Sequence, residues 1–134
     1  MKGTLDAGVL VVDDEPAIRR LLTRWLELKG CSAAAAATAE EALEMTRARP
    51  YDVILLDEGL PGMMGLPALM ELSRQTSAAI IMMTGRPSDD LERDALLLGA
   101  RAFVRKPLDL DALERTIRES LRGKEGAAPS AGGS

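Results

Sequence analysis

The sequence contains no histidine and only one cysteine, Cys31, and both scarcities narrow its chemistry. With one cysteine there is no disulfide within the chain. Without histidine there is no histidine-based catalytic triad, and no Cys/His set exists to hold a zinc ion. Any metal that the protein binds must therefore be held by oxygen ligands.

Aromatic side chains are also scarce, at 2% of 134 residues, whereas apolar residues make up 46%. Such a core consists of aliphatic residues and Met, and the scarcity of rings argues against nucleic-acid recognition by base stacking. The net charge is −4 and the basic residues are scattered, so a duplex-binding surface is not expected. The amino-terminal segment resembles neither a signal peptide nor a membrane span. We expect a cytoplasmic protein without direct contact to nucleic acid or membrane.

Short apolar runs alternate with segments of helical periodicity along the chain. The runs, which we interpret as strands, cover residues 8–12, 52–57, 78–83 and 102–105, with a weaker, alanine-rich one at 33–37. The helical segments begin at Pro16, at Thr38, at Leu66, at Ser88 or Asp89, and at Asp109 or Asp111. Runs this short and apolar are typical of parallel strands buried on both faces. The alternation predicts an α/β fold with a five-stranded, doubly wound parallel sheet flanked by five helices.

Two parts of this prediction depend on weak signals. The alanines at 33–37 favour a helix by propensity, but their place between Gly30 and the capping-box residue Thr38 favours a strand. Residues 123–134 are small, polar and without periodicity, so we expect a disordered tail or linker after one domain at 1–122.

Polar residues close four of the apolar runs. Asp13 and Asp14 follow the first run, Asp57 ends another, and Thr84 and Lys106 follow the last two. Because ligands of an open parallel sheet bind beyond the carboxyl ends of its strands, we expect these residues to share one crevice. Carboxylates crowded together raise one another's pKa unless a cation intervenes. A hard divalent ion, Mg²⁺ first and Mn²⁺ as an alternative, suits such ligands.

The chemistry that fits this set is phosphoryl transfer to a carboxylate. Asp57 would be the nucleophile, and Asp13 or Asp14 together with Asp57 would hold the metal ion. Lys106 and the Thr84 hydroxyl would hold the remaining phosphoryl oxygens. Positioning and electrostatics suffice for such a site, so it needs no histidine.

The segments VVDDE, VILLDEGLPGMMG, IIMMTG and GARAFVRKP resemble, in this order, the motif series of response-regulator receiver domains of two-component phosphorelay systems. The resemblance covers residues 8 to about 122 and implies a flavodoxin-like (CheY-like) sheet with residues 33–37 as its second strand. It implies Asp57 as the phosphoacceptor, Asp13, Asp14, Asp57 and the Gly59 carbonyl as metal ligands, Thr84 and Lys106 as catalytic partners of Asp57, Thr84 with Phe103 as the switch, and a cis bond between Lys106 and Pro107.

The resemblance also implies partners. A histidine kinase or histidine phosphotransfer protein would phosphorylate Asp57, and the surface of the fourth helix, fifth strand and fifth helix would engage an output partner that the sequence does not name. A phosphorylation-dependent homodimer is compatible with the same surface. The domain would assist only its own phosphorylation and dephosphorylation and would not be an enzyme with turnover.

One position departs from the usual pattern of the family, and two others bear on how long the phosphoryl group persists. Glu58 stands where the family usually carries an apolar residue, and we assign it no role. Gly59 and Arg86 match positions that tune autodephosphorylation in the family. Since Gly59 offers no side chain to orient a water and Arg86 can cover the phosphate, we expect a long-lived phosphoryl state.

Other interpretations remain open at this point. A Mg²⁺-dependent aspartyl-phosphate phosphohydrolase shares the Asp nucleophile, but it needs a second Asp where Gly59 stands. A binding module with a vestigial receiver fold would not need the intact polar set. The chain can also be a receiver excised from a DNA-binding regulator or from a hybrid histidine kinase.

Overall fold

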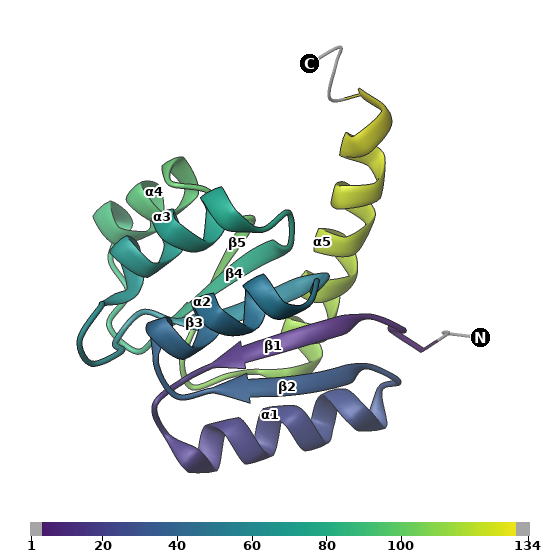
Figure 1. The fold of residues 1–134 in the computed structure, drawn as a ribbon, viewed down its shortest axis with the longest axis horizontal. Helices are drawn as coiled ribbons and strands as arrows, with labels where there is room; N and C mark the ends of the chain where they lie inside the picture. Colours follow the sequence, from purple (N-terminus) through teal and green to yellow (C-terminus); the bar gives the residue numbers. More distant parts are fainter. Residues whose placement is uncertain (1–3, 131–134) are drawn as a thin grey trace.

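The computed structural model describes residues 4–130, with side chains to residue 123. The strands are β1 (Gly8–Val12), β2 (Ser32–Ala36), β3 (Val53–Asp57), β4 (Ala79–Thr84) and β5 (Ala102–Arg105). The helices are α1 (Pro16–Leu28), α2 (Ala39–Ala48), α3 (Gly65–Gln75), α4 (Asp89–Leu97) and α5 (Leu110–Ser130). All strand pairs are parallel, in the order β2-β1-β3-β4-β5 (Figure 1). The predicted five-stranded, doubly wound sheet is confirmed.

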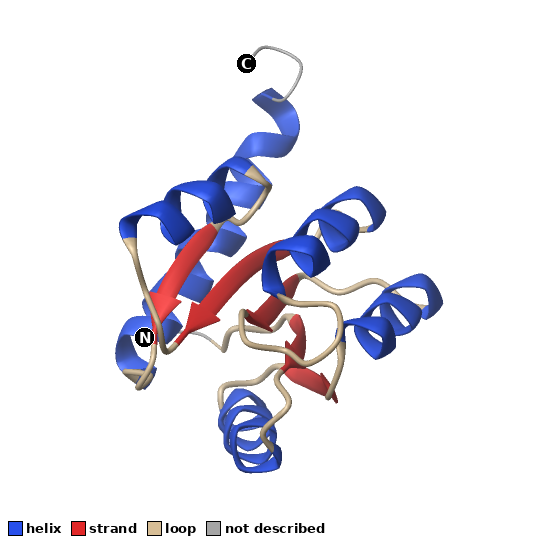
Figure 2. Cartoon of the chain, turned by 90° about the vertical axis from the view of Figure 1, so that its left-hand side faces the viewer, coloured by secondary structure: helices blue, strands red, loops and turns tan. Residues whose placement is uncertain are grey.

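Helices cover both faces of the sheet (Figure 2), which explains why the strands are apolar throughout rather than alternating. Successive strand residues point to opposite faces. In β1, Leu10 and Val12 pack into the cluster under α2, α3 and α4. Val9 and Val11 pack into the cluster under α1 and α5. The two cores together hold the central strands rigidly, so the residues at their carboxyl ends are placed by the sheet itself.

An ion-pair cluster links the helices α1 and α5. The Glu114 carboxylate lies 3.1 Å from Lys29 Nζ and 2.9 Å from Arg118 Nη2. These two cations hold the pKa of Glu114 below its ordinary value, through the bonds from Arg118 first and Lys29 second. The cluster therefore stabilises the packing of these helices while Glu114 is ionised.

Side-chain caps begin three of the helices. The Leu91 N–H donates to Ser88 Oγ at 3.0 Å, which selects Ser88 over Asp89 as the first residue of that turn. The Ala112 N–H donates to Asp109 Oδ1 at 3.1 Å, so Asp109 and not Asp111 caps α5. At α2, the Glu41 N–H donates to Thr38 Oγ1 at 3.1 Å.

The structure differs from the sequence-based expectations at the second strand. This strand lies one residue earlier than expected, at Ser32–Ala36, because its pairing with β1 fixes the register. Helix α5 runs to Ser130 and so includes the first residues of the segment that we predicted as a tail or linker. Its last turns project beyond the sheet in Figure 1, and residues 131–134 lie outside the described range.

The strand order defines where a site can form. The chain leaves β1 for the edge strand β2 and then crosses back past β1 to β3. The crossovers from β1 and β3 therefore run to opposite sides, and a crevice opens between the carboxyl ends of these two strands. Asp13 follows β1 and Asp57 ends β3 at this point. Within residues 4–130, no helix combines the length and the apolar character that crossing a bilayer requires.

Candidate functional site

Three carboxylates meet at the crevice between β1 and β3. Val12 pairs with Leu56 in the sheet, so the residues that follow, Asp13 and Asp57, sit at the same level. Asp13 is fully buried, Asp57 is 6% exposed, and Asp14 faces solvent. One oxygen from each carboxylate lies within 4.8 Å of the others. The end of the sheet thus concentrates negative charge in a largely desolvated place.

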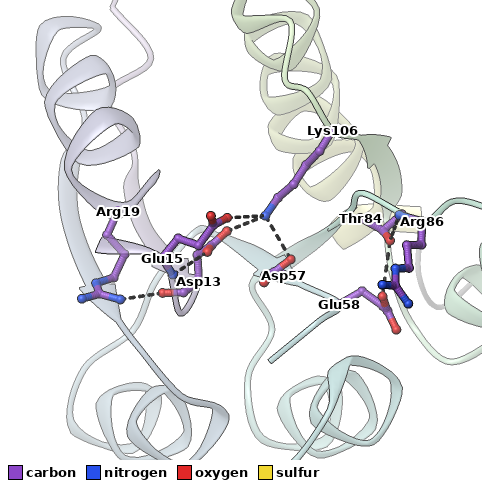
Figure 3. Close-up of polar contacts among 8 residues, drawn as sticks. All are labelled: Asp13, Glu15, Arg19, Asp57, Glu58, Thr84, Arg86 and Lys106. Atoms are coloured by element: carbon purple, nitrogen blue, oxygen red, sulfur yellow. Dashed lines mark hydrogen bonds and ion pairs between the residues drawn. The ribbon is translucent and has the colours of Figure 1, made fainter. Parts of the chain in front are cut away.

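Lys106 provides the positive charge in this cluster. Its Nζ lies 2.9 Å from Asp13 Oδ2 and 3.2 Å from Asp57 Oδ1, and the more exposed Glu15 carboxylate lies 3.8 Å away (Figure 3). The Lys106 N–H donates to the Thr84 carbonyl at 2.7 Å, which holds its backbone beside the end of β4. The peptide bond to Pro107 is cis, as the resemblance implied. The ammonium therefore bridges the ends of β1 and β3 from β5.

Asp13 is held in place by its own loop. The Glu15 N–H donates to Asp13 Oδ1 at 2.9 Å, and the Arg19 guanidinium donates to the Asp13 carbonyl oxygen at 2.8 Å. Sequence reasoning assigned no role to Glu15 or Arg19. The six-residue spacing from Asp13 to Arg19 follows no pattern that a sequence reveals, because the contact depends on how α1 leaves the strand.

Burial and neighbouring charges shift the pKa values of Asp57 and Lys106, and each of the two residues contributes to the shift of the other. Burial raises the pKa of Asp57 and the charge of Asp13 raises it further, whereas Lys106 and the Gly59 N–H lower it, with a net upward shift. Burial lowers the pKa of Lys106, but its bond with Asp13 and the charge of Asp57 outweigh burial, and the net shift is upward. Lys106 therefore stays protonated through the physiological pH range.

Thr84 belongs to a second group of contacts beside this cluster. It is 1% exposed, and its Oγ1 accepts a hydrogen bond from the Arg86 N–H at 3.0 Å. The same hydroxyl donates to Glu58 Oε1 at 3.3 Å (Figure 3). Sequence analysis assigned no role to Glu58. The structure places its carboxylate on the Thr84 hydroxyl, a contact that depends on the loop after β3 and has no sequence signal.

Two hydrogen bonds of the Glu58 backbone hold the loop after β3, one to β4 and one to the end of the loop. The Glu58 N–H donates to the Met83 carbonyl at 2.8 Å, and the Gly65 N–H donates to the Glu58 carbonyl at 3.0 Å. A Cβ on Gly65 would lie 2.6 Å from the Glu58 Cα, so only glycine fits there. A Cβ on Gly59 would meet nothing within 4 Å. The loop backbone at Gly59 therefore borders open space.

Phe103 lies on β5, opposite Met82 of β4. Its side chain is half-buried and packs against the core cluster under α2, α3 and α4. It is therefore neither fully in the core nor free in solvent.

The donor set of this crevice fits Mg²⁺. The three clustered carboxylates offer hard oxygen ligands, and their spacing allows one ion to contact all of them. Neither histidine nor the buried Cys31 competes with these oxygens for the ion. Charge supports the same conclusion, since Lys106 pairs with Asp13 and Asp57 and the cluster of three carboxylates still carries more negative than positive charge.

Comparison with known proteins agrees with this geometry. The family model described as response regulator receiver domain matches residues 9–118. The chain is 36% identical over 120 residues to the transcriptional regulatory protein KdpE of Mycobacterium tuberculosis, covering 90% of this chain and 53% of that protein. It is 35% identical over 115 residues to the regulatory protein AtoC of Escherichia coli, covering 85% of this chain and 25% of AtoC. The chain thus spans about half or less of the length of these relatives.

Solved structures show the same fold. A CheY-like response regulator receiver domain protein from Methanospirillum hungatei superposes with a TM-score of 0.86 at 30% identity, covering 95% of this chain and all of that one. NtrX from Brucella abortus superposes with a TM-score of 0.87 at 29% identity, covering 93% of this chain and 29% of NtrX.

Proposed function

This chain belongs to the response regulator receiver domain family of two-component systems, and on that premise we propose that Asp57 is its phosphoacceptor. The observation that carries the proposal is the Lys106 ammonium, which lies within 3.2 Å of both the Asp57 and the Asp13 carboxylates at the ends of three strands. A nucleophilic carboxylate, a fixed cation and further oxygen ligands are the parts that phosphoryl transfer to a protein side chain requires.

The role of each residue follows from its position. An Asp57 oxygen attacks phosphorus and forms the O–P bond while the bond between phosphorus and the donor breaks. Lys106 lowers the pKa of Asp57 against the effect of burial, and its ammonium is placed to contact phosphoryl oxygens as their charge grows. Thr84 is the second donor for those oxygens. The reaction needs no general base, because the attacking form of Asp57 is the carboxylate anion.

The proposal includes a metal ion, Mg²⁺ or alternatively Mn²⁺. Asp13, Asp14, Asp57 and the carbonyl of Gly59 would hold it. When bound, the ion supplies neutralisation of charge on the acceptor carboxylate and the incoming phosphoryl group. Without it, Asp13 and Asp14 would repel the same group.

Signalling would follow from a shift between two conformations. Thr84 moves toward the phosphoryl oxygens, and the half-buried Phe103 turns into the space that Thr84 leaves. The surface of α4, β5 and α5 changes as a result and engages the output partner or a second copy of the domain. The donor is a histidine kinase or histidine phosphotransfer protein, and the reaction takes place in the cytoplasm, as is typical of the family. The names of KdpE and AtoC favour a receiver that serves a longer regulatory protein.

Persistence of the phosphoryl group is a further part of the proposal. Gly59 presents no side chain to orient an attacking water, and Arg86 can extend over the phosphate. We expect a half-life well above seconds in the presence of Mg²⁺. The measurement is the decay of the phosphorylated fraction by intact mass after the donor is removed, and a half-life of seconds or less would contradict this expectation.

The central experiment is phosphorylation by acetyl phosphate with Mg²⁺, followed by intact mass measurement. The parent should gain about 80 Da, the mass of one phosphoryl group, and Asp57→Asn should not. Asp94→Asn, which removes an exposed carboxylate on α4, should gain the same mass as the parent. Equal gains in the parent and in Asp57→Asn would refute the assignment. Sustained catalytic release of phosphate from added substrates would instead support a phosphohydrolase.

A further inference from the structure

Glu58, which follows the proposed acceptor directly, makes a contact that the phosphorylation scheme does not use. Its carboxylate accepts the hydrogen bond from the Thr84 hydroxyl at 3.3 Å (Figure 3). The same Thr84 oxygen already accepts the Arg86 N–H. A threonine hydroxyl has one hydrogen to donate, so in this state that hydrogen is committed to Glu58.

The phosphoryl group would require the same hydrogen. Asp57 pairs with Met83 in the sheet, which places Thr84 one residue beyond the acceptor on the neighbouring strand. Adjacent strands lie about 4.8 Å apart, so three new acceptor oxygens on Asp57 would come within reach of the Thr84 hydroxyl. Since Thr84 is almost fully buried, its hydroxyl has few other partners. Glu58 and the phosphoryl group therefore compete for one donor.

The backbone fixes one side of this competition. Hydrogen bonds hold Glu58 through its N–H to Met83 and through its carbonyl to Gly65, and Gly65 packs against its Cα. The backbone of Glu58 is therefore held in place, and only rotation of its side chain can move the carboxylate away from Thr84.

We propose that Glu58 is a latch that holds the Thr84 hydroxyl in the unphosphorylated conformation and thereby sets the threshold of the switch. The inference rests on the proposed role of Asp57. Phosphorylation must first free Thr84 from Glu58. Thr84 also accepts the Arg86 N–H, so its movement pulls on the loop that leads to the Ser88 cap of α4. Glu58 is a positioning residue that acts through Thr84 and does not touch the reacting atoms.

The test is the affinity for beryllofluoride, a phosphoryl analogue, in the presence of Mg²⁺. Binding is monitored through the amide chemical shifts of Thr84 and Gly85. Glu58→Leu should bind about threefold to tenfold more tightly than the parent, because no acceptor then retains the hydroxyl. Glu58→Gln keeps an acceptor oxygen and should gain less. Glu40→Gln, which removes an exposed charge at the start of α2, should change the affinity less than twofold.

Removing the negative charge of Glu58 would by itself also favour binding of the anionic analogue. The same substitution in a second variant, Thr84→Val, separates this explanation from the latch. In Thr84→Val, which lacks the hydroxyl, Glu58→Leu should no longer improve the affinity. An equal improvement with and without the hydroxyl would show that Glu58 acts by repulsion only and would overturn the latch. An unchanged affinity in Glu58→Leu would overturn it as well.

A third measurement does not depend on Asp57 chemistry. Urea unfolding without divalent ions measures the coupling between Glu58 and Thr84 in four proteins. These are the parent, Glu58→Leu, Thr84→Val and the variant that carries both substitutions. We expect the effects of the two substitutions on the unfolding equilibrium constant to deviate from independence by about threefold or more. Independent effects would remove the latch. If the parent binds no beryllofluoride while the coupling is present, the proposed function fails and the hydrogen bond stands.

Discussion

Replacing the proposed acceptor, Asp57→Asn, should stabilise the protein in the absence of divalent ions. Asp57 is 6% exposed, and its ionised form faces Asp13 and Asp14 across the crevice. The substitution keeps the shape of the side chain and an oxygen that can accept a hydrogen bond from Lys106. It removes the charge and replaces one carboxylate oxygen with an NH2 group. A residue selected for chemistry rather than for stability is expected to behave in this way.

The magnitude follows from the distances in the site. At an effective dielectric constant of about 20, two like charges separated by 4.8 Å repel by about 3.5 kcal/mol. Attraction between Asp57 and Lys106 at 3.2 Å stabilises the ionised form by about 5 kcal/mol at the same dielectric constant. Removing the carboxylate from water costs several kcal/mol, and this cost adds to the repulsion. We therefore expect the free energy of unfolding to rise by about 1–2 kcal/mol, which corresponds to a Tm higher by about 3–6 °C.

Urea unfolding with EDTA at neutral pH measures this difference, with Asp94→Asn on the surface of α4 as the charge-matched control. The control should change stability by less than about 0.5 kcal/mol. The pKa of Asp57 is raised in the folded state, so its ionisation penalty is absent below the ordinary value of 3.8 and develops as the pH rises through the folded-state pKa. The advantage of Asp57→Asn should therefore shrink as the solution is acidified.

Added Mg²⁺ should reverse the order, since an ion bound by the carboxylates stabilises the parent and binds the variant weakly. A variant that is less stable than the parent in EDTA would show that the bond to Lys106 outweighs burial and repulsion. The description of the crevice as electrostatically strained would then be wrong.

Three further predictions test other parts of the structure. Lys106→Met should lower the free energy of unfolding by about 2–4 kcal/mol in urea without divalent ions, because two buried carboxylates lose their counter-ion; unchanged stability would contradict the ion pairs. Gly65→Ala should cost about 1–3 kcal/mol by thermal unfolding, since its methyl group would meet backbone 2.6 Å away, whereas Gly59→Ala, with nothing within 4 Å, should be nearly neutral; equal effects would refute the fastening of the loop. Glu114→Gln should be less stable than the parent above pH 4.5, and the difference should vanish as the pH falls through the lowered pKa of Glu114; a difference independent of pH would exclude the ion pairs as its cause.

The sequence predicted what depends on local pattern. Apolar runs and turn residues located the strands, and their carboxyl ends predicted a shared crevice for Asp13, Asp57 and Lys106. Local rules alone did not predict the alanines of β2 as a strand, because alanine prefers helix and only pairing with β1 makes that segment a strand. The choice of Asp109 over Asp111 as the cap was likewise decided by the geometry in which β5 leads into α5.

The contacts that could not be predicted are those made by loops. The bonds from Arg19 to the Asp13 carbonyl and from Thr84 to Glu58 join residues whose separations follow neither helical nor strand periodicity. Both depend on the directions in which the chain leaves β1 and β3.

The segment between Glu58 and Gly65 is closed on itself by the hydrogen bond from the Gly65 N–H to the Glu58 carbonyl. Packing adds to this closure, because Leu60 within the segment is buried and Met63 packs against the core cluster under α2, α3 and α4. Met64 is 54% exposed, so it can be exchanged for other residues without disturbing this packing or displacing the carboxylate of Asp57.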